Sequence, residues 1–371
     1  MVMAKRPEVQ TASAPVTALS MAGLAGSMLT GLAQVPFRRP WEGPSRVAGN
    51  IGQAVTRQTI RSFMGYLSGL PIDEFRSVER VIDDLCRVVM SPIVELLNDV
   101  ELTEDVIAGV PGVWCRARAS SESYVRQPER RESIGATLLY LPGGGYVGTT
   151  PMMYSAFVAS LVRVTGAEVF VVDYRKAPEY PFPAGVHDAA RVYHGLLVRG
   201  VDPQHLVVAG DSGGGGLAVS LIGRLHEDGE PMPAGMVLFS PQVDLVLDYP
   251  SITENAPYDV LPWNIPVTPY LKGISPDDER VSPVRSDTDP EWFPPTLVSW
   301  GRDEMFRDGI ADFVARLADA GVDVIGLEEP GMFHVYPILM PWAEASVRTY
   351  REVRDFTART VAPDPSAAQT H

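Results

Sequence analysis

The chain has 371 residues, of which 45% are hydrophobic and 21% charged, as is typical of a soluble globular protein with one large domain or one domain and an appendage. Its formal net charge of −15 argues against a nucleic-acid partner, which would require an excess of Lys and Arg. The two cysteines, Cys86 and Cys115, are too few for a disulfide framework or a zinc site. We therefore expect a cytoplasmic protein without a metal site.

An apolar stretch at residues 16–37 follows two basic residues near the N-terminus. Glycines and hydroxyl side chains interrupt it, so it matches a signal peptide or a membrane span poorly. Its apolar residues recur at helical spacing, from Met21 through Leu24 and Met28 to Leu32. We expect a helix packed on the body of the protein, with peripheral membrane contact or a signal peptide as the alternatives.

Helical patterns continue to about residue 100, with a second apolar stripe from Val78 through Leu85 to Val89. These patterns predict an N-terminal helical arm over residues 1–105. The last residues, 361–371, are expected to form a flexible tail.

The pattern then changes to short apolar runs that alternate with helical patterns. The runs lie at residues 113–117, 136–141, 167–172, 206–209, 236–239, 296–300 and 322–325, and the clearest helical patterns at residues 186–197, 217–225 and 310–317. Such runs suit strands that are buried on both faces of a sheet. We therefore predict an α/β fold with a mostly parallel sheet, whose ligands bind at the carboxyl ends of the strands.

The segment around Ser212 matches the pattern Gly-x-Ser-x-Gly between an apolar run and a helical pattern. A nucleophilic serine at such a place sits on a sharp, strained turn, which requires small residues on both sides. The turn also brings the N–H of Gly213 beside the reacting carbonyl. We predict that Ser212 is a nucleophile; a glycine-rich turn that binds phosphate or only connects two elements is the alternative.

Three consecutive glycines, Gly143, Gly144 and Gly145, follow the apolar run at residues 136–141. Glycines at a strand end expose backbone N–H groups that can bind an anion, which in acyl transfer is the tetrahedral intermediate. Alone, this loop could equally be a flexible turn. Together with Ser212, it predicts the second half of an oxyanion hole.

The acid should follow the serine along the chain and precede the histidine. The run at residues 296–300 ends at Gly301, and three carboxylates follow it. We predict Asp303 as the acid, because it lies two residues past Gly301 in the loop. Helix capping explains Asp308 more simply, and Asp308 and Glu304 remain the alternatives.

The predicted base is His334. Among the six histidines, His187, His194 and His226 fall in helical patterns upstream of the predicted acid, and His371 is terminal. Only His334 follows the acid and lies in a loop after an apolar strand.

Together these segments resemble the bacterial hormone-sensitive-lipase family of esterases within the α/β hydrolases. The resemblance covers about residues 105–356. It rests on residues 142–146, where the family has His-Gly-Gly-Gly, on residues 173–179 and 181–184, on residues 210–215, on Ser240-Pro241 with Asp244, on residues 301–303 and on His334.

The resemblance implies an α/β-hydrolase catalytic domain at residues 106–360. It implies a cap built from the N-terminal helices and an insertion at about residues 245–290. It further implies hydrolysis of short- to medium-chain carboxylic esters without a cofactor. The implied oxyanion donors are Gly144, Gly145 and Gly213, with Gly143 as a further candidate.

The chain departs from the family pattern at three positions. Pro142 replaces the histidine before the glycines, and its fixed φ restricts the loop. Gly213 stands where the family usually has alanine, and Lys176 where it usually has leucine.

The expected chemistry is two-step acyl transfer, with Ser212 attacking a small-molecule ester, His334 taking its proton and Asp303 orienting the imidazole. A lactone hydrolase or an acyltransferase would use the same triad, and a non-catalytic receptor on this fold is the alternative from another class. A homodimer is a further hypothesis. Candidates for the pocket wall, each also explained by core or cap packing, are Tyr146, Met64, Tyr66, Trp263 and Phe333.

Overall fold

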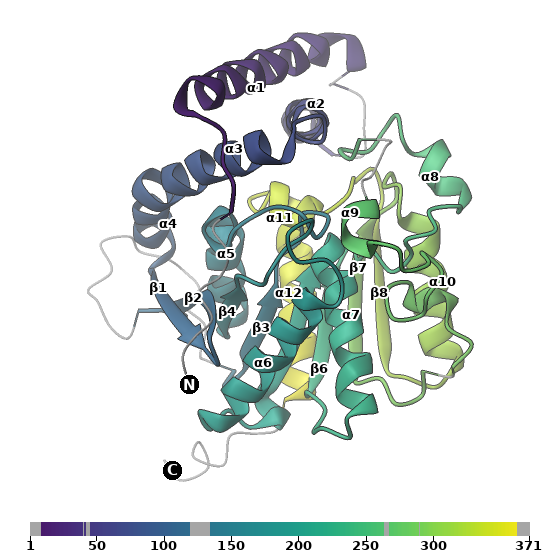
Figure 1. Ribbon diagram of the computed structural model, residues 1–371. Coiled ribbons are helices and arrows are strands. Elements are labelled where there is room, and N and C mark those ends of the chain that lie inside the picture. Colours follow the sequence, from purple (N-terminus) through teal and green to yellow (C-terminus); the bar gives the residue numbers. More distant parts are fainter. Residues whose placement is uncertain are drawn as a thin grey trace.

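The computed structural model of the protein describes residues 9–361, apart from 40, 42–44, 119–133, 263–266 and 289. A single eight-stranded sheet lies at the centre, with helices on both faces and a layer of helices over one end (Figure 1). The strands are β1 (Val100–Ile107), β2 (Val110–Ala117), β3 (Thr137–Leu141), β4 (Glu168–Val172), β5 (Leu206–Asp211), β6 (Gly235–Phe239), β7 (Thr296–Gly301) and β8 (Val324–Glu329). Their order in the sheet is β1-β2-β4-β3-β5-β6-β7-β8.

The predicted mostly parallel sheet is confirmed. Only β2 runs against its neighbours, β1 and β4, and all other pairs are parallel. The central strands β3, β5, β6 and β7 are buried along their whole length, which explains why they appear in the sequence as continuous apolar runs.

The first strand, β1, was not predicted. It is an edge strand whose residues Glu101, Thr103 and Glu104 are exposed, and acidic residues are uncommon in strands. A turn at Ala108 and Gly109, both with positive φ, joins it to β2. The sheet therefore begins at Val100, inside the range predicted as the helical arm.

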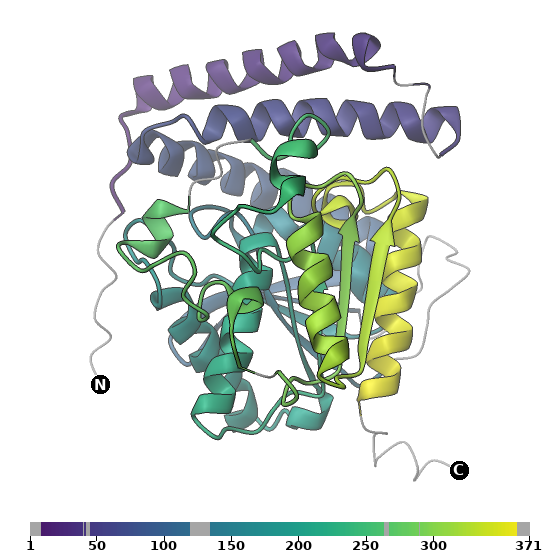
Figure 2. The same cartoon turned by 90° about the vertical axis from the view of Figure 1, so that its right-hand side faces the viewer.

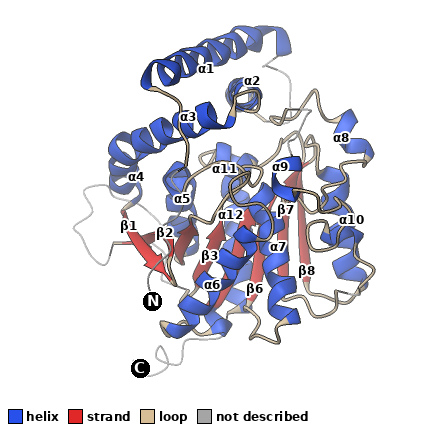
Figure 3. Cartoon of the chain, viewed as in Figure 1, coloured by secondary structure: helices blue, strands red, loops and turns tan. Residues whose placement is uncertain are grey.

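Helices cover both faces of the sheet (Figure 3). They are α1 (Ala14–Gln34), α2 (Val47–Leu67), α3 (Ile72–Leu85), α4 (Ser91–Asn98), α5 (Ser155–Thr165), α6 (Ala184–Val198), α7 (Ser212–Glu227), α8 (Pro250–Glu254), α9 (Thr268–Leu271), α10 (Arg307–Asp319), α11 (Tyr336–Leu339) and α12 (Glu344–Thr360). Side chains of α6, α7 and α10 pack on one face, and side chains of α5 and α12 on the other.

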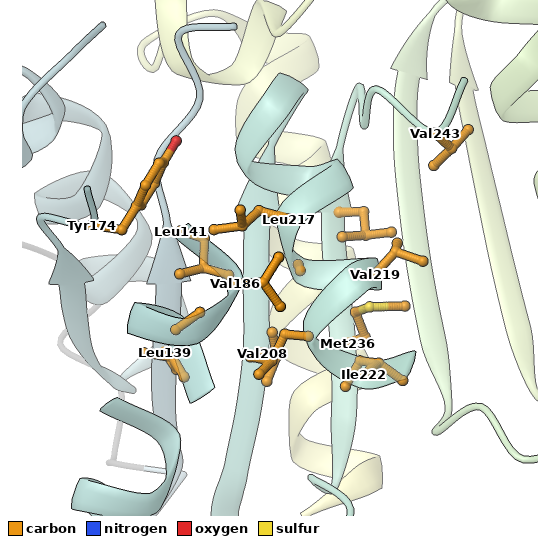
Figure 4. Packing of buried hydrophobic residues seen from close by; sticks show 14 of the residues in the cluster. Leu139, Leu141, Tyr174, Val186, Val208, Leu217, Val219, Ile222, Met236 and Val243 are labelled. Atoms are coloured by element: carbon orange, nitrogen blue, oxygen red, sulfur yellow. The ribbon is translucent and has the colours of Figure 1, made fainter. Parts of the chain in front are cut away.

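The core fixes the position of α7. Leu217 and Ile222 of this helix pack with Val208 of β5 and Met236 of β6, and all four side chains are fully buried (Figure 4). Burial of each such side chain contributes about 1.5–3 kcal/mol. The helix begins at Ser212, five residues before the predicted start, so its first turn directly follows β5.

The N-terminal helices form a cap over one end of the sheet, and α1 and α2 lie along each other in its outermost part (Figure 2). The predicted apolar face of the first helix is only partly turned inward. Leu24 is buried against the rest of the cap, whereas Leu29 and Leu32 are exposed. Within the described residues, the segment Ala14–Arg38 is the one helix long and apolar enough to cross a membrane by length and composition.

Among its described residues, the predicted insertion at residues 245–290 contains α8, α9 and a 3-10 helix at Pro283–Arg285. The predicted tail lies outside the described residues, except for Val361.

Candidate active site

Ser212 lies at the junction of β5 and α7 with a φ of +51°, a left-handed conformation that is rare for residues other than glycine. The flanking glycines are needed because the backbone passes very close. A Cβ on Gly214 would collide with the carbonyl oxygens of Leu141 and Pro142, and a Cβ on Gly210 would lie 2.6 Å from the carbonyl oxygen of Gly214. The strained turn expected from the sequence pattern is therefore present.

His334 lies on the loop between β8 and α11, and its Nε2 is 2.9 Å from Oγ of Ser212. Its side chain is only 2% exposed. Two hydrogen bonds fix the backbone at the histidine. The N–H of His334 donates to Oδ1 of Asp259, and the N–H of the next residue, Val335, donates to Oγ of Ser240. The structure thus brings the predicted nucleophile and the predicted base together.

The carboxylate beside the histidine is Glu304 and not the predicted Asp303. Oε1 of Glu304 lies 3.7 Å from Nδ1 of His334, and neither of these buried atoms has a hydrogen-bond partner among the described residues. Oε2 of Glu304 accepts hydrogen bonds from Oγ of Ser240 at 2.6 Å and from the N–H of Gly301 at 2.8 Å. Glu304 is therefore fixed with one oxygen aimed at the imidazole.

Asp303 faces the cap instead. Its Oδ2 lies 3.4 Å from the guanidinium of Arg57 in α2, and about a third of its side chain is exposed (32%). Neighbouring residues of the turn after β7 point in different directions, so the turn brings only one of the two carboxylates to the histidine. Spacing along the chain could not distinguish them.

Asp308, the other alternative, accepts a hydrogen bond from the N–H of Ser251 at 2.9 Å. Ser251 lies in the first turn of α8, so Asp308 caps that helix from the beginning of α10. Asp308 therefore caps a helix, as expected, but this helix is α8 and not α10, in whose first turn Asp308 itself lies.

The charges around His334 favour its protonated form. Burial alone would lower the pKa of His334, but the nearby carboxylate of Glu304 and the negative charges of Asp259 and Asp211 leave this pKa raised above its ordinary value. Burial in turn raises the pKa of Glu304. The imidazole can thus accept a proton although it is enclosed.

Asp259, a residue of the insertion, was missed by the sequence analysis. Its buried carboxylate accepts hydrogen bonds from the N–H of His334 at 2.9 Å and from the N–H of Met305 at 2.8 Å. It therefore ties the loop of the histidine to the loop of Glu304. No local pattern reveals this role, because its partners are backbone groups in distant segments.

The glycine loop, residues 143–145, lies beside Ser212. A Cβ on Gly213 would be 3.3 Å from the Cα of Gly145, so the two predicted halves of the oxyanion hole are adjacent. No hydrogen bond of the described residues uses the N–H of Gly144, Gly145 or Gly213. In contrast, the N–H of Gly143 donates to Oδ1 of Asp211 at 2.9 Å, which contradicts its proposed role as a further oxyanion donor.

Asp211 anchors this loop and was also missed. Its carboxylate accepts hydrogen bonds from the hydroxyls of Tyr140 at 2.8 Å and Tyr154 at 2.9 Å, besides the one from Gly143. Burial raises the pKa of Asp211 to about 6, although these hydrogen bonds oppose the shift. The carbonyl of Pro142, the residue that replaces the family histidine, accepts a hydrogen bond from the hydroxyl of Tyr174 at 2.7 Å.

Comparison with known proteins agrees with this architecture. A family model described as the α/β hydrolase fold matches residues 138–338, more than half of the chain. An acetyl-hydrolase of Streptomyces hygroscopicus is 36% identical over 57% of this chain and 70% of its own length. An esterase of Acinetobacter venetianus is 30% identical over 74% of this chain and 86% of its own.

Among solved structures, an esterase from the bacterial hormone-sensitive-lipase family is similar with a TM-score of 0.65 and 27% identity, covering 95% of this chain and all of that one (100%). The chain belongs to the hormone-sensitive-lipase family of α/β hydrolases. It is a carboxylic ester hydrolase, and the expected resemblance is confirmed.

The predicted pocket residues of this esterase lie in different environments. Tyr146 follows the glycine loop and stacks on Tyr270, with ring centroids 3.7 Å apart. Phe333 is fully buried beside His334, and Met64 packs against the main core. The hydroxyl of Tyr66 instead lies against Gly23 of α1, within the cap. Trp263 lies outside the described residues.

Helix α2 connects the cap of the esterase to the catalytic loops. Arg57 donates to the carbonyl of Gly331 at 3.2 Å and pairs with Asp303, and Arg61 donates to the carbonyl of Asp259 at 2.8 Å. Gln53 contacts the sulfur of Met332 at 3.2 Å. One helix of the cap therefore touches the loops that carry His334, Glu304 and Asp259.

Proposed function

We propose that the protein hydrolyses short- to medium-chain acyl esters through a covalent acyl-enzyme on Ser212. The observation that carries this proposal is the 2.9 Å distance between Oγ of Ser212 and Nε2 of His334 on a strained strand–helix turn. The name of the Streptomyces relative, an acetyl-hydrolase, supports a short acyl group.

In the first step, Oγ of Ser212 attacks the ester carbonyl while Nε2 of His334 takes the hydroxyl proton. Glu304 orients the ring through Nδ1 and stabilises the imidazolium that forms. Its 3.7 Å separation is compatible with this role, because such contacts often tighten only when substrate is bound. His334 then gives the proton to the departing alcohol, and the acyl group remains on Ser212.

The negative oxygen of the tetrahedral intermediate needs hydrogen-bond donors. We assign this role to the N–H groups of Gly144, Gly145 and Gly213. Gly213 follows Ser212 and lies against Gly145, Gly144 precedes Gly145, and none of the three N–H groups donates to another described residue. Loss of one such donor typically costs about 10²–10³ in turnover.

In the second step, water replaces the alcohol. His334 takes a proton from the water as it attacks the acyl carbon, and then returns this proton to Oγ of Ser212 as the carboxylic acid leaves. Lactone hydrolysis, or acyl transfer to an alcohol, would use the same residues. The products separate these reactions: an acyltransferase forms a new ester when alcohol is added, whereas a hydrolase releases acid.

The test is hydrolysis of p-nitrophenyl esters from acetate to palmitate by the wild type and by Ser212→Ala. We expect the wild type to prefer the short and medium chains and the variant to lose essentially all turnover. A folded Ser212→Ala protein that kept its activity would contradict the acyl-enzyme, and a preference for palmitate would contradict the chain-length proposal.

A further inference from the structure

The outer face of α1 is apolar, uncharged and uncovered. It consists of Leu19, Ala22, Gly26, Leu29 and Ala33, and Phe37 continues the same line at spacings of three and four residues. All six are exposed, with Leu29 at 66% and Phe37 at 85%. From the first to the last of them the line is about 27 Å long.

The inner face of the same helix is already occupied. A Cβ on Gly23 or Gly31 would collide with Tyr66 or with Ser62 of α2, so the two helices are in close contact. Oγ of Ser27 also donates to the carbonyl of Ser62 at 3.1 Å. A helix that is apolar on all sides is normally buried or lies in lipid. In α1, the side that faces α2 is buried, and the exposure of the opposite apolar side remains to be explained.

Aromatic and basic residues surround the turn between α1 and α2. Phe37 and Trp41 are exposed there, together with Arg38, Arg39 and Arg46. These three arginines and Glu42 give residues 9–56 a net charge of +2, whereas the whole chain carries −15. The next two arginines of α2, Arg57 and Arg61, face the loops of the site and do not add to this surface. Aromatic and basic side chains of this kind favour the interface between lipid headgroups and water, and the local positive charge complements anionic lipid.

We propose that the outer face of α1, together with the exposed side chains of Phe37, Arg38, Trp41 and Arg46, docks on an anionic lipid surface. In this arrangement α1 lies in the plane of the interface and keeps its inner face on α2. Because α2 also touches the catalytic loops, the ester site would lie about 20 Å from the lipid, roughly two helix diameters. Binding of this kind does not depend on the catalytic proposal and can be measured without substrate.

The probe is sucrose-loaded vesicles, made either of phosphatidylcholine alone or of phosphatidylcholine with one-third phosphatidylglycerol. We expect the full chain to sediment with the anionic vesicles, more weakly with the neutral ones, and less as salt is added. The double variant Leu29→Ser/Phe37→Ser should bind at least about tenfold more weakly. Arg38→Gln/Arg46→Gln should bind the anionic vesicles about tenfold more weakly and the neutral ones unchanged.

A matched control is Val198→Ser, which removes an equally exposed apolar residue (87%) at the end of α6. It should bind as the wild type does. None of these positions belongs to the catalytic machinery, so turnover of a soluble p-nitrophenyl ester verifies that each variant is folded.

Three results would overturn the proposal. The first is no difference between vesicles and a vesicle-free control. The second is binding that resists alkaline carbonate, since α1 would then span the bilayer. The third is a dimer in sedimentation equilibrium that Leu29→Ser/Phe37→Ser dissociates, because a second copy of the chain would then cover this face.

Discussion

Two adjacent carboxylates, Asp303 and Glu304, share one turn but have different environments. Glu304 is fully buried and aims one oxygen at Nδ1 of His334, whereas Asp303 is partly exposed and pairs with Arg57. A buried carboxylate behind a histidine can hold the tautomer in which Nε2 accepts a proton. We therefore assign the role of the acid to Glu304 and an accessory role to Asp303.

This assignment predicts different losses for two matched substitutions. Glu304→Gln removes the charge but keeps the size, and we expect kcat/KM to fall by about 10³–10⁴. Asp303→Asn should cost less than about tenfold, because its carboxylate contacts the cap and not the imidazole. Steady-state kinetics on a p-nitrophenyl ester would check both values, and the reverse order would restore Asp303 as the acid.

The charges around His334 predict the pH dependence. Only the neutral imidazole can take the proton of Ser212, and the pKa of His334 is raised above its ordinary value. Activity should therefore rise with pH, with its acidic limb above about pH 6.5. Loss of the negative charge in Glu304→Gln should lower the pKa of His334 and move this limb to lower pH. A pH profile of kcat/KM measures both, and a limb that stays in place would show that Glu304 does not act on the histidine.

At the scale of elements, α2 acts on the site through Arg57, whose guanidinium lies partly buried between the loops of Asp303 and Gly331. Burial lowers the pKa of Arg57, while the negative charges of Asp303 and Asp259 oppose this shift. Its contacts hold the helix against the two loops that carry Glu304 and His334. The cap is therefore part of the support of the site and not only its cover.

Arg57→Met should consequently reduce both activity and stability. We expect kcat to fall about tenfold and the free energy of unfolding to fall by about 1–3 kcal/mol, because the carbonyl of Gly331 and the carboxylate of Asp303 lose a charged donor. Arg46→Met, at the exposed beginning of the same helix, is the control. Steady-state kinetics and urea denaturation measure both effects. If Arg57→Met and Arg46→Met changed activity and stability equally, α2 would only cover the site and not support it.

Across the whole molecule, burial is unevenly distributed. The strand β5 is buried at every position, whereas α1 buries only Ser20, Leu24 and Gly31. The catalytic sheet and its flanking helices form the large core, and α1 is attached to it through α2 and α3.

This distribution predicts the pattern of amide hydrogen exchange. In the absence of lipid, amides of α1 should exchange at least about 10² faster than those of β5, because local opening of α1 exposes little apolar surface. Exchange followed by mass spectrometry would measure the difference. Equal protection of the two elements would mean that α1 unfolds only together with the sheet.

The sequence by itself predicted the mostly parallel sheet, and it singled out Ser212 and His334, whose side chains the structure brings together. Strands buried on both faces must be continuously apolar, and a serine on a sharp turn must have small neighbours, so both leave a local pattern. Among the strands of the described residues, β1 alone was not predicted, because an exposed edge strand tolerates charged side chains and lacks the continuous apolar pattern.

Only the tertiary structure decided which groups surround the serine and the histidine. The choice of Glu304 over Asp303 depends on how the turn after β7 meets the loop after β8, and the loss of Gly143 as a donor depends on Asp211. Likewise, only packing on α2 shows which side of α1 remains uncovered. These are distances between segments far apart in the chain, and no spacing of residues along the sequence encodes them.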